Sequence, residues 1–67
     1  MTNTKLLLSK IKDSGLKLSF IANRLNMSRQ SFNRRIYGRT EFKAPEIKEL
    51  CNILNLSGIE KEKIFFA

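Results

Sequence analysis

The segment from residue 18 to residue 37 is the part of the sequence that most constrains the fold, because it predicts two short helices joined by a tight turn. Asn26 tolerates the left-handed backbone conformation that such a turn needs, and Ser28 is a good cap for the helix that follows it. Gly38 is expected to end that second helix, and Ala22 supplies a small side chain where the two helices cross. The two expected helices span about residues 18–25 and 29–37.

Three further helices are expected outside this segment. Thr4 is the expected cap of a first helix that ends before Gly15, and Pro45 is expected at the first position of a fourth helix. Ser57 and Glu60 match a capping box for a short fifth helix. Apolar residues at spacings of three and four support the first and fourth helices: Leu7, Leu8, Ile11, Ile47, Leu50, Cys51 and Leu54. Because no segment predicts a strand, we expect an all-α fold.

Length and composition limit what such a chain can do. Its 67 residues predict a single domain over 1–67 with a small core. One cysteine and no histidine argue against disulfides and the usual zinc sites, and Cys51 is expected in the core. Without a histidine base, a glycine-rich phosphate loop or a carboxylate pair in an apolar setting, we expect no enzyme, no cofactor, no metal and no small-molecule substrate. No run of about 18 apolar residues predicts a membrane span, and the amino-terminal residues do not match a signal peptide.

Positive charge is concentrated in the first part of the chain. Residues 1–40 contain nine Lys/Arg against one acidic residue and carry a net charge of +8, whereas residues 41–67 carry −1. All five arginines lie between Arg24 and Arg39, where there is no acidic residue. Arginine suits phosphate oxygens and guanine edges, so this distribution predicts a polyanionic partner, with nucleic acid favoured over a solvated basic surface.

The expected helix over 29–37 has a narrow apolar face and a broad polar one. At about 100° per residue, Phe32 and Ile36 point toward the core, and Gln30 and Arg34 point away from it. Tyr37, Asn33 and Ser31 lie on or beside the same outer face. Gln30 suits adenine through N6 and N7, and Arg34 suits guanine through O6 and N7. Two helices of these lengths and a three-residue turn match a helix-turn-helix over about 18–37.

At these residues the chain resembles the Cro and repressor-like helix-turn-helix family of phages and bacteria. The family pattern of Ala, then Gly-Val-Ser, then an apolar residue, then Gly is met by Ala22, residues 26–28, Phe32 and Gly38. The stretch over 15–66, notably GRTEFKAPEIKEL and the closing IFFA, looks like that of small Cro-like proteins.

The resemblance implies a five-helix lambda-repressor-like fold and a sequence-specific transcriptional regulator, a Cro-like repressor. The helix over 29–37 would enter the major groove of double-stranded DNA, at an operator that is an inverted repeat. It also implies a homodimer on DNA and, for a phage protein, the cytoplasm of a bacterial host.

Three departures from the family pattern affect the expected contacts. Leu18 stands where members often have a phosphate-binding glutamine, so that contact is expected to move to Lys17. Asn26 replaces the turn glycine. Arg35 replaces an apolar residue, so Ile36 is expected to point toward the core in its place. This change leaves open which residues of the helix face the bases.

The expected DNA contacts combine the resemblance with the helical wheel. The family's reading positions select Arg29, Gln30 and Arg34, whereas the wheel places Arg29 nearer the scaffold. The full set of expected base contacts is Arg29, Gln30, Ser31, Asn33 and Arg34. The expected phosphate contacts, which position the protein without reading sequence, are Lys17, Ser28, Tyr37, Arg39, Thr40 and Lys43.

The apolar carboxy-terminal residues allow a second interpretation. Ile64, Phe65 and Phe66 are the expected dimer contact, but they also suit a protein-interaction module of the antirepressor or antitoxin kind. If this segment is extended, one phenylalanine closes the core and the other is exposed. Phe42 is expected to anchor its loop in the core. An anionic-membrane or RNA binder is disfavoured, because the chain lacks a broad apolar helix face and an aromatic stacking platform.

Several charged side chains are expected to have intramolecular or solvent roles. The role of Arg35 stays open: it either contacts DNA or forms an ion pair with a glutamate such as Glu41. Arg24 is expected either to pair with Asp13 or to remain in solvent. The lysines of the first helix, which are Lys5, Lys10 and Lys12, are expected to be solvated.

Overall fold

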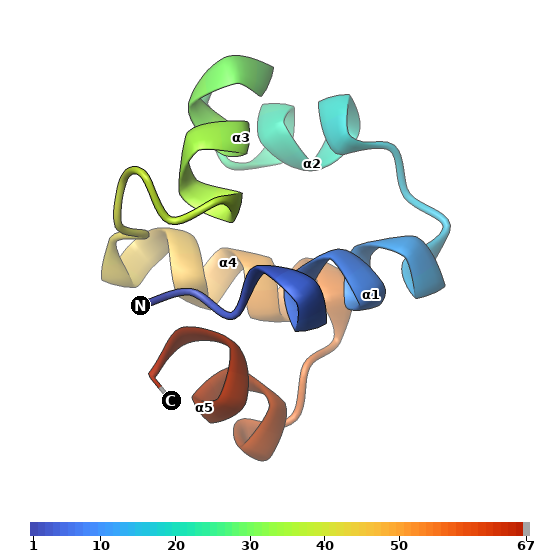
Figure 1. The fold of residues 1–67 in the computed structure, drawn as a ribbon. Coiled ribbons are helices and arrows are strands. Elements are labelled where there is room, and N and C mark those ends of the chain that lie inside the picture. The colour runs from blue at the N-terminus through green and yellow to red at the C-terminus, as the bar shows by residue number, and fades with distance from the viewer. Residues whose placement is uncertain (67) are drawn as a thin grey trace.

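The computed structural model describes residues 1–66, which contain five α-helices joined by loops and no strand (Figure 1). The helices are α1 (Thr4–Ser14), α2 (Leu18–Arg24), α3 (Arg29–Ile36), α4 (Ala44–Leu54) and α5 (Gly58–Phe65). The prediction of an all-α chain with five helices is confirmed. Ala67, the last residue of the apolar IFFA run, lies outside the described residues. Within residues 1–66, no helix is both long enough and apolar enough to cross a bilayer.

The helix boundaries follow local signals in most places. Gly15 (φ 72°) and Asn26 (φ 57°) adopt the left-handed conformation, as predicted. The Ser28 hydroxyl accepts a hydrogen bond from the Ser31 amide at 3.0 Å, which caps α3. Ser57 and Glu60 form the predicted capping box of α5, with bonds in both directions.

Two expected helix starts are wrong by one position. The Asn3 side chain, not Thr4, caps α1 and accepts a hydrogen bond from the Leu6 amide at 3.1 Å. Thr4 is the first residue of α1, and its hydroxyl instead donates to the Ile36 carbonyl at the end of α3, 2.5 Å away. Pro45 is the second residue of α4, which begins at Ala44, so proline still occupies the first turn, where its missing N–H costs nothing.

The core lies between α1 and the other helices, since α1 packs against α3, α4 and α5 while α2 packs against α3. The buried apolar residues are Leu7, Ile11, Ile21, Ala22, Leu25, Phe32, Ile36, Phe42, Ile47, Leu50, Ile64 and Phe65. Phe42 anchors the α3–α4 loop as predicted, and its ring packs edge to face with Phe32 at 6.3 Å and with Phe65 at 5.4 Å. Cys51 is only partly buried, but it packs against this core, and burial raises the pKa of its thiol.

The carboxy-terminal aromatic residues differ from the expectation in backbone conformation. Ile64 and Phe65 lie in α5 and are buried, so they are not available as a dimer contact on the surface. Phe66 follows the helix and is 57% exposed. The prediction that one phenylalanine closes the core while its neighbour is exposed is confirmed. The segment is helical rather than extended, however, and the divergence of the two rings comes from the turn of the helix.

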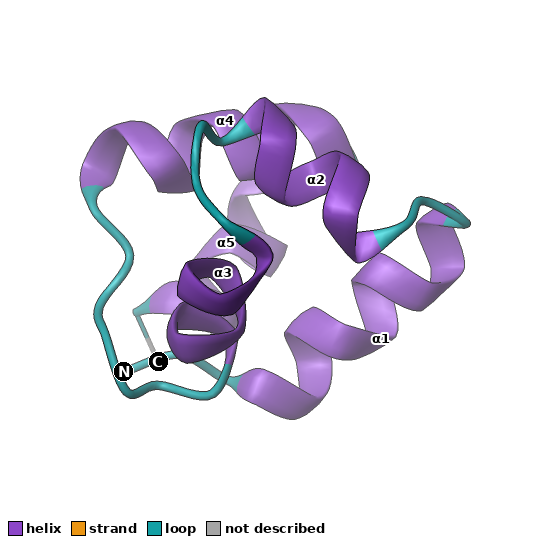
Figure 2. Ribbon diagram, turned by 90° about the horizontal axis from the view of Figure 1, so that it is seen from above, coloured by secondary structure: helices purple, strands orange, loops and turns teal. Residues whose placement is uncertain are grey.

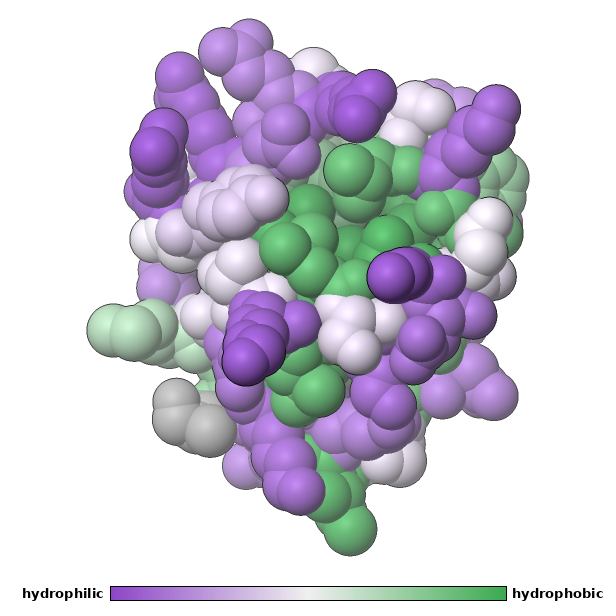
Figure 3. Space-filling view, turned by 45° about the vertical axis from the view of Figure 1, so that its right-hand side comes forward, coloured by the Kyte–Doolittle hydropathy of each residue, from purple (hydrophilic) through white to green (hydrophobic). Residues whose placement is uncertain are grey.

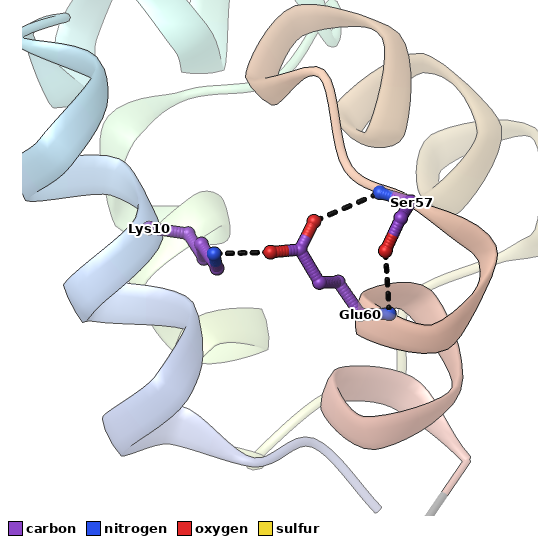
Figure 4. A network of polar contacts seen from close by, with 3 residues as sticks. All are labelled: Lys10, Ser57 and Glu60. Atoms are coloured by element: carbon purple, nitrogen blue, oxygen red, sulfur yellow. Dashed lines mark hydrogen bonds and ion pairs between the residues drawn. The ribbon is translucent and has the colours of Figure 1, made fainter.

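Two contacts fasten α1 to α5. Lys10 forms an ion pair with Glu60, whose other oxygen accepts the Ser57 amide of the capping box (Figure 4). The Asn3 amide donates to the Ile64 carbonyl at 2.6 Å. The expectation that Lys10 is merely solvated is therefore wrong, because α5 brings a carboxylate to it from fifty residues along the chain. Lys5 and Lys12 are exposed, as expected.

Candidate nucleic-acid interface

The α2–α3 pair forms one end of the molecule, at the top of Figure 1, and Figure 2 looks onto this end. A link over residues 25–28 joins the two helices. Its path is fixed by the left-handed Asn26 and by a hydrogen bond from the Met27 amide to the Ala22 carbonyl at 3.1 Å. Ala22 is buried, and Met27 is partly buried against the core. Asn26 therefore has the turn role that the sequence predicted, and Ala22 is buried with its carbonyl bonded to the link.

The two faces of α3 differ as the helical wheel predicted. Phe32 and Ile36 are completely buried. The opposite face is exposed and surrounds an open hollow of about 400 Å³. The residues that line this hollow are Gln30, Asn33, Arg34, Tyr37 and Arg39. All five were among the expected DNA contacts, three as base contacts and two as phosphate contacts.

Other predicted contacts lie outside the lining of this hollow. Arg29 is exposed on the first turn of α3, whereas Ser31 is only partly exposed. Ser28 uses a hydroxyl lone pair for the α3 cap but keeps its proton free to donate. The expected phosphate contacts that remain, each exposed in a loop or at a helix end, are Lys17, Thr40 and Lys43.

The segment after α3 shapes one wall of the hollow. Gly38 is left-handed (φ 77°), which ends the helix and turns the chain back. The amides of Arg39 and Thr40 then donate to the Arg34 carbonyl, at 2.8 and 3.3 Å. This closing turn holds Arg39 beside the exposed end of α3, where Tyr37 also lies.

The five arginines divide into two groups. Arg24 pairs with Glu49 at 3.3 Å and Arg35 pairs with Glu46 at 3.0 Å, both across to α4. Arg35 therefore forms an ion pair with a glutamate, one of its two open alternatives, although the partner is Glu46 rather than Glu41. The expected pairing of Arg24 with Asp13 is wrong. Within residues 1–66 the remaining three arginines form no ion pair, and all are exposed: Arg29, Arg34 and Arg39. Three unneutralised cations thus stand on or beside the outer face of α3, and hydrophilic side chains gather at this end in Figure 3.

Two residues that support this site were not selected from the sequence. Thr4 holds the last carbonyl of α3 from thirty-two residues away, and no local pattern points to such a contact. Glu46 accepts from the Arg35 guanidinium and from the Lys43 amide, so it ties α3 to the start of α4. A glutamate three residues after a helix cap, just after a proline, is a recognisable capping signal. The sequence therefore does point to the bond that Glu46 accepts from the Lys43 amide.

The described residues include no group of three or more Cys, Asp and Glu side chains that could hold a metal ion. Comparison of the chain with protein-family models, with curated proteins and with solved structures found no match.

Proposed function

We propose that this protein is a sequence-specific double-stranded DNA-binding regulator in which α2 and α3 act as a Cro-type helix-turn-helix. The observation that carries the proposal is the outer face of α3, where three exposed arginines without ion pairs in residues 1–66 stand among amide side chains. The other two arginines of this end, Arg24 and Arg35, are neutralised by glutamates of α4, so the arginines left without a partner are those on or beside this face.

In the proposed complex, α3 lies in the major groove and reads base edges with its outer face. Gln30 and Arg34 are about one turn apart and both line the hollow, so they would address base pairs close together along the groove. Gln30 would pair with adenine and Arg34 with guanine, each contact contributing about 1–3 kcal/mol of discrimination. Asn33 lies beside them and can donate and accept at a base edge.

Phosphate contacts would position α3 without reading sequence. Tyr37 and Arg39 stand at the far end of the hollow, and exposed Lys17 precedes α2. Log affinity for non-specific duplexes should therefore fall with log salt concentration, with a slope of about −0.9 for each phosphate neutralised. A weak salt dependence on such DNA would count against the proposal.

The size of the domain favours two copies on one operator. Its longest dimension is 27 Å, which is less than the roughly 34 Å between the centres of successive half-sites on one DNA face. One copy would therefore cover one half-site, and an inverted repeat would recruit a homodimer. Occupancy of such a site would repress transcription by excluding polymerase or a competing regulator.

A protein-interaction module is the second candidate, favoured by one observation. Phe66 is exposed at the edge of a hollow of about 230 Å³ between α4 and α5. Its other lining residues are Phe42, Ala44, Ile47, Lys48 and Lys61. A module of this kind would use the α4–α5 side and would not need the outer face of α3.

Selection of bound sites from a random duplex pool, at about 150 mM salt, tests the proposal. We expect an enriched inverted repeat, and we expect the Gln30→Ala/Arg34→Ala variant to lose it. Lys48→Ala/Asn52→Ala is the matched control, since it removes one cation and one amide, also four residues apart, from the exposed face of α4. Loss of enrichment in both variants, or a pool that stays unenriched with wild-type protein, would contradict sequence-specific reading.

A further inference from the structure

The contact between α3 and the start of α4 is built differently from the other ion pair in this region. Arg35 Nε donates to Glu46 Oε1 at 3.0 Å, and the two side chains are only 15% and 18% exposed. The same carboxylate oxygen accepts the Lys43 amide at 2.9 Å, and the guanidinium also donates to the Ser31 carbonyl at 3.2 Å. Each charged group is thus anchored to the backbone of its own helix, which makes the pair a rigid bridge.

Apart from the short turn from α2 and the Thr4 hydroxyl bound to its last carbonyl, α3 is held in the described structure mainly by its buried face and by this bridge. The buried face of α3 consists of Phe32 and Ile36, which are four residues apart and form one narrow stripe along the helix. Burial of such a stripe resists withdrawal of the helix from the core, but it resists rocking about the stripe only weakly. Arg35 adjoins that stripe and faces α4, so its bond to Glu46 supplies a restraint off the stripe.

The orientation of α3 matters because its reading residues project far from the helix axis. A small rotation about the stripe displaces the ends of Gln30 and Arg34 by more than it displaces the backbone. Bidentate contacts with base edges depend on close alignment of donors and acceptors. Contacts with phosphates tolerate such displacement better, because a flexible cation acts there largely as a point charge.

We infer that Glu46 is a positioning residue for sequence recognition, acting through Arg35 to set the rotation of α3, an inference that rests on the proposed function. Glu46 is well suited to reveal this role, because a carboxylate is repelled by phosphate. Its removal makes the protein more basic, which by charge alone strengthens DNA binding. A loss of selectivity on neutralising Glu46 therefore reports the orientation of α3.

Glu49 provides the matched control on the same helix. It pairs with Arg24 at 3.3 Å, with side chains 53% and 38% exposed, and makes no other side-chain hydrogen bond within residues 1–66. Glu46→Gln and Glu49→Gln each remove one negative charge and keep the side-chain shape. The two positions are three residues apart on α4. Such an exposed pair contributes little to structure, so Glu49→Gln isolates the effect of charge.

The experiment measures the ratio of affinities for the duplex enriched from the random pool and for an unrelated duplex at the same salt concentration. For Glu46→Gln we expect this ratio to fall about tenfold. A loss of this size lies within the discrimination that one bidentate contact with a base supplies. For Glu49→Gln we expect it to stay within about twofold of wild type. Thermal unfolding under the same conditions shows that each variant is folded.

A double-mutant cycle tests whether the effect passes through Arg35. We expect Arg35→Gln/Glu46→Gln to show the same affinity ratio as Arg35→Gln alone, because the bridge is already broken. Additive losses, or equal ratios for Glu46→Gln and wild type, would overturn the inference while leaving the proposed function standing.

Amide NMR spectra of the free protein test the positioning step without DNA. We expect Glu46→Gln to shift resonances along the whole of α3 and Glu49→Gln to shift only those near its own site. If the Glu46→Gln shifts stay within the first turn of α4, the inference fails. A wild-type protein that enriches no duplex would instead remove the proposed function, and with it the basis of the inference.

Discussion

The outer face of α3 leaves its arginines without ion pairs within residues 1–66, whereas the scaffold formed by α1, α4 and α5 pairs some of its charges and leaves several lysines exposed. In the scaffold, Lys10 pairs with Glu60, and α4 supplies Glu46 and Glu49 as partners for arginines of the α2–α3 end. On α3, Arg34 has no acidic partner within residues 1–66 and is exposed. Net charge alone therefore says little about function. An unpaired cation is informative where it stands beside amide and hydroxyl side chains that can form directed hydrogen bonds, as Arg34 does on α3.

Replacement of a buried aromatic residue should have the greatest effect on stability. We expect Phe32→Ala to destabilise the fold by about 3–5 kcal/mol, because Phe32 is completely buried against Phe42. In a domain this small, such a loss takes most of the stability and DNA binding with it. Chemical denaturation followed by circular dichroism measures the change.

Phe20→Ala is the matched control for that substitution. Phe20 is exposed on α2, and its ring lies 5.9 Å from the Arg24 guanidinium. We expect a loss of less than about 1 kcal/mol, consistent with an exposed cation–π contact. Similar losses for Phe20 and Phe32 would mean that α2 and α3 pack differently from the arrangement described above.

Removal of one arginine from each group should separate their roles. We expect Arg34→Ala to weaken binding to the enriched duplex by about 1–3 kcal/mol with little change in stability, because Arg34 has no ion pair to lose within residues 1–66. Arg24→Ala removes the same charge but also the Glu49 pair. Its binding loss should be smaller and equal on enriched and unrelated duplexes. Fluorescence anisotropy on both duplexes distinguishes these outcomes, and equal effects of the two substitutions would contradict the division.

Ser28 has two roles that can be separated, since its hydroxyl caps α3 and is also an expected phosphate donor. We expect Ser28→Ala to cost about 1 kcal/mol of stability through loss of the cap. Ser28→Asp keeps a cap and places a negative charge near the start of α3, which the helix dipole favours. Stability should therefore be retained in Ser28→Asp while affinity for DNA falls. Unchanged affinity in this variant would show that the start of α3 does not approach phosphates.

Local features of this fold could be predicted from sequence because their causes are local. Gly15, Asn26 and Ser28 act through their own backbone conformation or through neighbours within a few residues. The two faces of α3 likewise follow from helical periodicity, which explains why the lining of the hollow matches the expected contacts.

Contacts between helices were predicted poorly, because they depend on how the helices are arranged in space. The spacing of residues along the sequence does not determine that arrangement. Asp13 and Glu41 are nearer in sequence to Arg24 and Arg35 than the true partners are, but the folded chain brings carboxylates of α4 within ion-pair distance of both arginines. The hydroxyl of Thr4 reaches α3 for the same reason. Apolar composition alone also did not separate buried Ile64 from an exposed contact surface.

The smallest change is expected where α1 meets α5, and its size should depend on pH. The hydrogen bond from Lys10 lowers the pKa of Glu60 from 4.5 to about 2, with a further contribution from the Ser57 amide. Lys10 remains charged in this range, because its ordinary pKa of 10.5 lies far above it and the hydrogen bond to Glu60 raises that pKa further. The stabilisation by Glu60 is therefore complete above the ordinary pKa of 4.5 and is lost as the pH falls toward about 2.

Glu60→Gln should accordingly be less stable than wild type at neutral pH, and the difference should shrink steadily as the pH falls through that interval. Thermal unfolding of both proteins across it measures the change. Glu62→Gln, an exposed glutamate of α5 without an ion pair in residues 1–66, should show no such convergence. Parallel curves for Glu60→Gln and wild type would mean that Lys10 and Glu60 do not pair in the folded protein. Within residues 1–66 the scaffold would then have no ion pair of its own to set against the unpaired arginines of the outer face of α3.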